Sequence, residues 1–223
     1  PKLDIIEITK KTNLKKALVG SDIVIDLVGI LHESNSESFD DIHAKRLKNI
    51  ANAASEAGVK RFIHLGALGS LKNAPSKYLQ SKAKGEYFIR QECIKCTWTI
   101  FKPSIIFGPK DKFINLFYTM VKYLPVILLI SPFAKFQPIY VNDVVEIIIK
   151  SFYDKKTFNK SYDLGGPNIY SFFEIIKLIA AFQKRRVWIL PLSNKISYIM
   201  VRIIECLPLK IITRDNLKSL SID

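Results

Sequence analysis

The alternation of buried strands with amphipathic helices constrains this fold more than any other feature of the sequence. Residues 22–29 (Asp-Ile-Val-Ile-Asp-Leu-Val-Gly) form an almost continuous apolar run, which is typical of a strand buried on both faces of a parallel sheet. Apolar residues at helical spacing follow over residues 39–57, and Gly58 ends this predicted helix. A further strand, helix and strand are predicted at residues 61–65, 76–92 and 97–101. This order predicts an α/β fold with a doubly wound parallel sheet.

The second half of the chain is more irregular but also contains regular elements. Ser171 is a predicted helix N-cap, and Glu174 completes a capping box with it. The Pro-containing apolar segment 123–133 predicts a loop or a short, partly buried turn. The other predicted elements are helices at 112–122, 142–153, 171–182 and 194–206 and strands at 3–6, 136–141, 161–164 and 187–190. We expect residues 1–110 to form the parallel-sheet domain. Residues 111–223 are expected to form a smaller α+β part that packs on it and contributes a further sheet strand.

The net charge favours acidic partners. The 34 Lys and Arg residues exceed the 20 Asp and Glu residues by 14. Such a surface attracts anionic lipid headgroups, nucleic acid or nucleotide phosphates. The excess is mostly Lys, which argues against a protein that reads nucleic-acid sequence, because that role favours the bidentate Arg side chain. Genomic base bias is an equally good explanation of a Lys- and Ile-rich composition.

The cysteines and histidines do not form a recognisable metal or disulfide pattern. Cys93, Cys96 and Cys206 are too few for a disulfide framework, and they are expected to be ordinary reduced thiols of a reducing compartment. The C-x-x-C pair has no second pair and no nearby His to complete a metal site. The three histidines, His32, His43 and His64, show no ligand spacing, and His64 is expected to be packed within a strand.

No segment of the sequence has the pattern of a signal peptide or of a membrane span. The longest apolar stretch, 124–133, is about half the length that crosses a bilayer, which excludes a single-pass membrane protein. The chain begins at Pro1 without Met. We therefore expect it to be a fragment of a longer chain.

Tyr78 and Lys82 are the residues most indicative of chemistry. At positions i and i+4 of a predicted helix they share one face, one turn apart. A nearby ammonium favours the phenolate and is therefore expected to lower the pKa of the Tyr hydroxyl toward use as an acid or base. The same Lys can hydrogen-bond a ribose. A solvated helix face also carries Tyr and Lys at this spacing, so the motif needs its context.

That context is an ordered set of motifs. They are 27–31 (Leu-Val-Gly-Ile-Leu), 62–69 (Phe-Ile-His-Leu-Gly-Ala-Leu-Gly), 78–86, 103–115, 136–143, 162–167 (Tyr-Asp-Leu-Gly-Gly-Pro) and 213–217 (Thr-Arg-Asp-Asn-Leu). Together they resemble an extended, or atypical, short-chain dehydrogenase/reductase of the NAD-dependent epimerase/dehydratase type. Within it they resemble the branch that contains the NAD(P)H-binding accessory subunit of respiratory complex I and its bacterial relatives. The resemblance covers nearly the whole chain and implies a Rossmann-like fold with a dinucleotide site in residues 1–110 and a small substrate or partner subdomain in residues 111–223.

The resemblance implies roles for individual residues. Tyr78 and Lys82 take the acid/base and ribose-binding positions. Ligands of open α/β sheets lie beyond the carboxyl ends of the strands, where the other implied cofactor-binding residues stand. These are Glu7, Val28, Gly29, Ile30, Leu65, Gly66, Ala67, Lys102, Pro103, Ser104 and Ile105. The cofactor is NADPH or NAD(H), with the preference not readable, and no metal is expected.

Three departures from the family pattern bear on catalysis. The glycine-rich phosphate-binding motif is absent, so we expect the first βαβ unit, about 50–60 residues, to precede residue 1. Gly66 stands where active members carry Ser or Thr, with Ser70 four residues on. Glu7 replaces an Asp. A site that keeps Tyr and Lys but lacks the hydroxyl predicts dinucleotide binding without fast turnover.

The first functional hypothesis is therefore an accessory subunit of a respiratory NADH:quinone oxidoreductase that holds NAD(P)H as a structural cofactor. Its partners would be the dinucleotide and a membrane-bound respiratory complex, with no specific nucleic acid. It would lie in the bacterial cytoplasm, peripheral to the inner membrane, or on the matrix side of the mitochondrial inner membrane. One alternative is an active NAD(P)-dependent epimerase, dehydratase or reductase that uses Tyr78 and Lys82. A second alternative is a scaffold in quinone biosynthesis.

The helix at 194–206 raises the question of a lipid surface. Its apolar stripe is expected to pack against the sheet. With basic residues alongside, the same stripe is also what a protein bound to an anionic lipid surface shows. The stripe consists of Ile196, Ile199, Met200, Ile203, Ile204 and Leu207.

Overall fold

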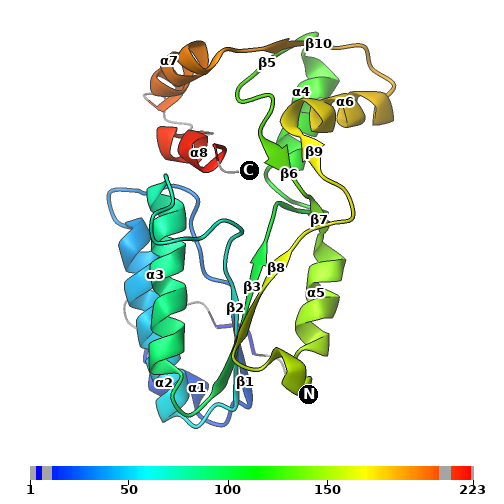
Figure 1. Cartoon of the computed structure of the whole chain (residues 1–223). Coiled ribbons are helices and arrows are strands. Elements are labelled where there is room, and N and C mark those ends of the chain that lie inside the picture. Colours follow the sequence, from blue (N-terminus) through cyan, green and yellow to red (C-terminus); the bar gives the residue numbers. More distant parts are fainter. Residues whose placement is uncertain (1–3, 7–11, 206–211, 222–223) are drawn as a thin grey trace. The chain divides into compact units, whose positions relative to one another are not determined.

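The computed structural model describes residues 4–6, 12–205 and 212–221. The chain divides into two compact units, which are described separately. The first unit comprises residues 1–66, 81–101 and 150–162, and the second comprises residues 67–80, 102–149 and 163–223. Figure 1 shows the elements of both.

A four-stranded sheet is the centre of the first unit, and two of its strands continue into the second. Its order is β1-β2-β3-β8, and β1, β2 and β3 are parallel. The helices α2 and α3 lie on one side of this sheet (Figure 1). The bounds are α1 Leu14–Leu18, β1 Ile23–Asp26, η1 Asp40–Arg46, α2 Leu47–Glu56, β2 Arg61–Leu65, α3 Lys77–Glu92, β3 Thr97–Pro103, η2 Lys155–Thr157 and β8 Lys160–Leu164. The predicted α/β class with a parallel sheet is confirmed.

Strand β1 is shorter than the sequence predicts. It ends at Asp26, three residues before Gly29, the predicted end of the strand. Residues 27–30 consequently form a loop beyond the carboxyl end of the strand. Of the strand predicted at 3–6, residues 4–6 form no strand, and Leu3 lies outside the described residues.

The helix predicted at 39–57 exists but begins as a π-helix. The first seven residues form η1, and α2 continues it. As predicted, Gly58 ends the helix, with the positive φ of +77° that glycine adopts without strain. Gly85 of α3 packs directly on η1, since a Cβ at this position would collide with the carbonyl oxygen of His43.

The core of the first unit lies between the sheet and the helices. It is formed by Leu18, Leu47, Ile50, Ala51, Ala54, Val59, Phe62, Ile89, Cys93, Cys96 and Ile100. Cys93 and Cys96 are free and buried here, as the prediction of reduced thiols requires, whereas Cys206 lies outside the described residues. Within the described part of the chain, no group of three or more His, Cys, Asp or Glu residues is arranged to hold a metal ion.

Arg61 is a buried cation with a full set of partners. Its guanidinium donates to the carbonyl oxygen of Ser151 at 2.9 Å and to Oγ1 of Thr99 at 2.9 Å. It also donates to the carbonyl oxygen of Phe152 at 3.3 Å and lies 4.2 Å above the ring of Phe158. These contacts tie strand β2 to the segment that leads into β8.

The second unit consists of short strand pairs and helices. β4 and β7 are parallel, β6 and β9 antiparallel, and β5 and β10 parallel. The capping box predicted at Ser171 and Glu174 is present at the start of α6. The bounds are β4 Ile106–Phe107, α4 Ile114–Tyr123, β5 Val126–Leu129, β6 Lys135–Phe136, β7 Ile139–Tyr140, α5 Val141–Lys150, β9 Tyr170–Ser171, α6 Phe172–Phe182, β10 Trp188–Pro191, α7 Asn194–Glu205 and α8 Arg214–Ser219.

Three sequence predictions for the second unit are wrong in part. The predicted loop 123–133 contains β5, which β10 stabilises by pairing. The strand predicted at 136–141 is split into β6 and β7 around Pro138, which has no backbone N–H to donate to a sheet. The predicted core stripe of α7 is largely exposed: Ile196, Ile199 and Ile203 are 53%, 59% and 62% exposed. Val201 is the buried apolar residue of that helix, and Leu207 lies outside the described residues.

No helix in the described ranges has both the length and the apolar character needed to cross a membrane.

Candidate functional site

A buried polar cluster lies at the carboxyl ends of β1 and β2 in the first unit. Asp26 and His64 stand opposite each other in the register of these parallel strands. Oδ2 of Asp26 and Nδ1 of His64 are 2.7 Å apart, and both side chains are almost fully buried. His64 is thus packed within its strand, as predicted, but it is paired with a carboxylate that the sequence analysis did not connect to it.

Lys82 adds a buried ammonium to this cluster. The residue is 5% exposed, and burial lowers its pKa, against the attraction of Asp26 and Glu86. Its Nζ donates to the carbonyl oxygen of Leu65 at 3.4 Å, which is its only hydrogen-bond acceptor among the described residues. An ammonium has three donors, so two remain for a further polar group.

Gly29 approaches this ammonium from the loop after β1. A Cβ on Gly29 would lie 3.2 Å from Nζ of Lys82 and 3.5 Å from Nε2 of His43. The glycine therefore lets the backbone of this loop pack closely against the Lys82 ammonium. The flanking Val28 and Ile30 are half-buried, and Gly29 is exposed.

His43 holds this loop in place. The backbone N–H of Ile30 donates to Nε2 of His43 at 3.0 Å, so Nδ1 carries the proton and donates to Oγ of Ser81 at 2.9 Å. Burial, followed by the charges of Lys82 and His64, lowers the pKa of His43 to about 3. The imidazole is consequently neutral under ordinary conditions. The sequence analysis missed His43 as a functional residue, because no local pattern links it to Ile30 or Ser81.

His64 has one ring nitrogen to spare. Its Nε2 is buried and has no hydrogen-bond partner in the part of the chain that the structure describes. Buried polar atoms are normally paired. The two spare donors of Lys82 suit a ligand rich in hydroxyl groups, such as a ribose.

The start of α3 and its Tyr78 belong to the second unit, where α8 caps them. The carboxylate of Asp215 accepts from the backbone N–H of Lys77 at 2.8 Å and from that of Tyr78 at 2.9 Å. Ser219 donates to Oγ of Ser76 at 2.8 Å. The segment 213–217 therefore anchors the helix turn that carries Tyr78. The sequence analysis recognised this segment only as part of a motif.

The pKa of Tyr78 moves in the direction opposite to the one expected. Burial raises it to about 12, whereas the sequence analysis expected the ammonium one helical turn away to lower it. The cause is removal of the phenol from water, which penalises the charged phenolate. Tyr78 is therefore a hydrogen-bond donor near neutral pH and a poor base.

The predicted site residues 102–105 are held by neighbouring strands of the second unit. Nζ of Lys102 lies 3.2 Å from Oδ1 of Asp163. Oγ of Ser104 accepts from the backbone N–H of Gln137 at 3.2 Å. The carbonyl oxygens of Pro103 and Ile105 accept backbone bonds from Leu68 and Ile139 at 3.0 Å and 2.9 Å. The segment is consequently rigid, and Lys102 is partly neutralised.

The residues directly after β2 are Gly66, Ala67 and Leu68, none of which carries a hydroxyl. The backbone N–H of Gly66 donates to the carbonyl oxygen of Phe101 at 2.7 Å. Ala67 is buried, and Ser70 is buried in a turn that its backbone N–H closes on the carbonyl oxygen of Ala67. Glu7 lies outside the described residues.

Comparison with protein families and curated proteins identifies relatives of this chain. The model of a family described as NAD(P)H-binding matches residues 2–113. The chain is 36% identical over 176 residues to the mitochondrial NADH dehydrogenase [ubiquinone] 1 alpha subcomplex subunit 9 of Mus musculus, covering 78% of this chain and 46% of the relative. It is 30% identical over 192 residues to the protein of that name in Dictyostelium discoideum, covering 84% and 52%. The chain thus spans about half the length of these relatives.

Solved structures with a similar fold bind nicotinamide dinucleotides. MoeE5 in complex with UDP-glucose and NAD has a TM-score of 0.71 at 14% identity, covering 84% of this chain and 71% of that chain. The dTDP-4-dehydrorhamnose reductase of Bacillus anthracis, in complex with NADP, has a TM-score of 0.68 at 20% identity, covering 82% and 70%. At such low identity the likeness shows the fold alone, and it confirms the Rossmann-like class.

Proposed function

The chain belongs to the NAD(P)H-binding family, whose ligand is a nicotinamide dinucleotide, and we propose that it holds this dinucleotide mainly as a structural cofactor, within an accessory subunit of a respiratory NADH:quinone oxidoreductase. The observation that carries the proposal is the buried Lys82, whose ammonium has a single long hydrogen bond and lies against the loop backbone at Gly29. Gly29 follows the carboxyl end of β1, and Lys82 of α3 donates to Leu65 at the carboxyl end of β2, the edge of the sheet where this fold binds its ligands.

Lys82 would bind the ribose hydroxyls with its two spare donors. Gly29 would let the backbone of the loop come close to the cofactor, and His43 would keep that loop in place through Ile30. The other predicted contacts, Val28, Leu65, Gly66, Ala67, Ser104 and their neighbours, stay proposals. When bound, the dinucleotide supplies hydride chemistry, so what decides turnover is what the chain places around it.

The chain's own residues favour retention of the cofactor over turnover. Gly66 offers no hydroxyl to polarise a carbonyl group of a substrate. The raised pKa of Tyr78 makes its phenol a donor that does not readily accept a proton near neutral pH. General acid–base catalysis is efficient when the pKa of the group lies near the working pH. We therefore expect slow or absent turnover.

The assignment to a respiratory complex rests on the relatives. The Mus musculus and Dictyostelium discoideum proteins are named as subunits of NADH dehydrogenase [ubiquinone], and the matches cover most of this chain. The protein would then be peripheral to the membrane, on the cytoplasmic face of a bacterial inner membrane or the matrix face of a mitochondrial one. An anionic lipid surface would be a further partner.

An active NAD(P)-dependent epimerase, dehydratase or reductase is the second candidate. The observation that favours it is the presence of both Tyr78 and Lys82, one turn apart on α3. In an active enzyme Tyr78 would move a proton to or from the substrate, and Tyr78→Phe would abolish turnover.

The test is to purify the full-length protein and to measure the nucleotide that it retains. We expect tightly held NADPH or NADH, with no turnover in the wild type or in Tyr78→Phe. Lys82→Met should lower the affinity for the nucleotide about 10- to 100-fold, the effect of losing charge-assisted hydrogen bonds. Lys84→Met is the matched control, because Lys84 lies on the same helix but is exposed and paired with Asp40.

Two results would overturn the proposal. Equal nucleotide affinity in Lys82→Met and Lys84→Met would show that the cluster does not hold the ligand. Rapid cofactor exchange with activity that disappears in Tyr78→Phe would identify an enzyme instead.

A further inference from the structure

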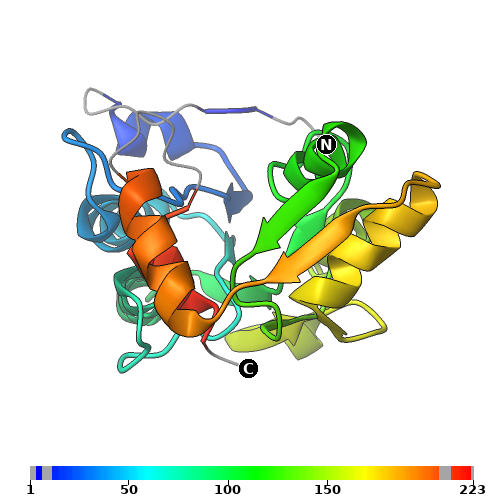
Figure 2. The same cartoon turned by 90° about the horizontal axis from the view of Figure 1, so that it is seen from above.

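The two-stranded sheet of the second unit has one covered face and one bare face. β5 and β10 lie side by side and are parallel (Figure 2). In their register Trp188 is opposite Val126 and Leu190 opposite Leu128. The helices α4 and α6 cover the face that carries Ile127 and Leu129, both of which are buried against residues of these helices. In the part of the chain that the structure describes, nothing covers the opposite face.

The bare face is entirely apolar. Trp188 is 76% exposed, Leu128 49%, Leu190 47% and Val126 41%. These four residues form two cross-strand pairs and hence one continuous patch, because alternate residues of a strand share a face. A contiguous exposed apolar patch of this kind marks an interaction site.

Helix α7, the next element after β10, also exposes apolar side chains. Helix α7 begins three residues after β10, and its residues Ile196, Ile199 and Ile203 are all more than half exposed. Their spacing places them on one face of the helix. Two successive elements thus leave apolar side chains in solvent.

The segments that build this surface carry mainly positive charge, with one acidic residue in the first turn of α6 (Glu174) and one at the end of α7 (Glu205). Residues 175–204, which include β10 and most of α6 and α7, contain six basic residues and no Asp or Glu. Residues 112–135, which include α4 and β5, contain three Lys and no Asp or Glu. The whole chain has 34 basic and 20 acidic residues, so the absence of acidic residues is local. The charge complements an anionic surface.

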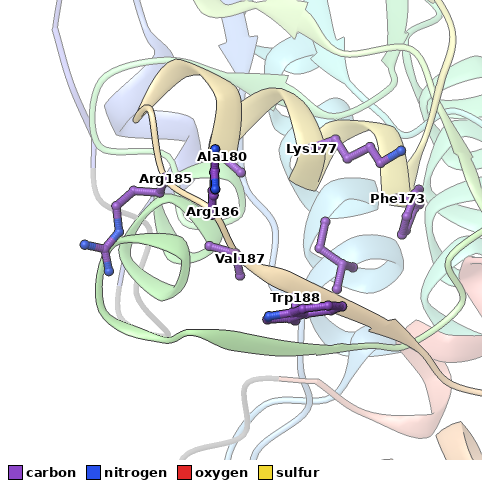
Figure 3. Close-up of a pocket in the computed structure, with 8 residues that line it drawn as sticks. Phe173, Lys177, Ala180, Arg185, Arg186, Val187 and Trp188 are labelled. Carbon is purple, nitrogen blue, oxygen red and sulfur yellow. The ribbon is translucent and has the colours of Figure 1, made fainter.

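A hollow of about 430 Å³ at the start of β10 brings cations next to the exposed Trp188 (Figure 3). It is lined on one side by Lys177 of α6 and on the other by Arg185 and Arg186. Neither arginine forms an ion pair with any described residue. Unpaired guanidinium groups bind phosphate well because their geometry is bidentate.

We propose that the bare face of β5 and β10, with the exposed stripe of α7, docks on an anionic lipid bilayer. The apolar side chains enter the interface, Trp188 lies at the depth of the headgroups, and Arg185 and Arg186 bind lipid phosphates. Trp and Arg prefer this boundary because each has an apolar body and a polar tip. The inference deepens the proposed peripheral location and rests on it for the presence of a membrane.

The test measures binding of the full-length, nucleotide-loaded protein to vesicles. We expect the protein to sediment with vesicles of equal parts phosphatidylcholine and phosphatidylglycerol, to release at high salt, and not to bind phosphatidylcholine alone. In Trp98→Phe, Trp188 is the one remaining Trp of the two in the chain, and its emission should shift to the blue on binding.

Matched variants separate this surface from general charge and hydrophobicity. The double variant Arg185→Gln/Arg186→Gln should bind about 30-fold more weakly, from the usual contribution of two cations at an anionic leaflet. Lys95→Gln/Lys160→Gln removes the same charge from exposed positions of the first unit and should bind within about twofold of the wild type. Leu128→Ser should weaken binding, whereas Ile94→Ser, at a more exposed residue of the first unit, should not.

Several outcomes would overturn the proposal. These are equal binding to uncharged vesicles, an unchanged Trp188 emission, or equal losses in the two charge variants. A homodimer that Leu128→Ser dissociates would instead identify a second copy of the chain as the occupant, and a stable lipid-free complex with another protein through this face would identify that protein. Nucleotide content is measured in the same samples, so retained nucleotide with no vesicle binding refutes this inference and leaves the proposed cofactor role standing.

Discussion

Acidification should destabilise the first unit through His43. Its pKa is lowered to about 3 in the folded protein, against an ordinary value of 6.5. Between these two values the unfolded chain binds a proton that the folded chain excludes, so stability falls as the pH falls below 6.5. Between about pH 7 and about pH 5, this one group should cost about 2 kcal/mol of unfolding free energy. A protonated His43 also has no lone pair for the N–H of Ile30, which would release the loop at Gly29.

The assay is urea unfolding of the full chain across this pH range. In a Trp188→Phe background the remaining Trp98 reports on the first unit, to which it belongs. His43→Asn removes the titrating group while keeping an N–H donor near Ser81. We expect this variant to be about 1–2 kcal/mol less stable at neutral pH, since the N–H of Ile30 loses its acceptor. Its stability should depend less steeply on pH than that of the wild type.

The reasoning is refuted if the wild type and His43→Asn lose the same stability between neutral and acidic pH. In that case the acid sensitivity would come from other groups, and the neutral imidazole held by burial would not be its cause.

Three further predictions concern single side chains. Lys82→Arg should keep the charge but not the compact ammonium beside Gly29, and calorimetric titration with NADPH should show weaker binding than in the wild type, by about tenfold. Arg61→Met should destabilise the protein by about 2–4 kcal/mol in urea unfolding, because it leaves buried carbonyl groups without a donor. Lys60→Met, at an exposed ion pair, should leave the stability nearly unchanged. Asp215→Ala should cost about 1–2 kcal/mol and increase hydrogen exchange at the first amides of α3, since both N–H bonds to this carboxylate are lost. Unchanged exchange at those amides would contradict the capping role.

The sequence predicted the elements of the first unit well and those of the second unit less well. β2, β3, α2 and α3 follow from apolar periodicity and from punctuation such as Gly58, which are local signals. Strand β5 was missed because all four of its residues are apolar, so no alternation distinguishes the face that α4 and α6 cover from the bare one. Only pairing with β10, about 60 residues away in the chain, makes this segment a strand.

The candidate site divides in the same way. The sequence by itself determined that Tyr78 and Lys82 share a helix face, because helical spacing depends on neighbours in the chain. The tertiary structure decided that Asp26 pairs with His64 and that His43 forms hydrogen bonds with Ile30 and Ser81. It also decided that the pKa of Tyr78 is raised. Burial and electrostatic environment depend on which distant segments surround a group, and local sequence does not carry that information. For this reason the chemistry of the site, unlike its position in the fold, depends on the folded chain.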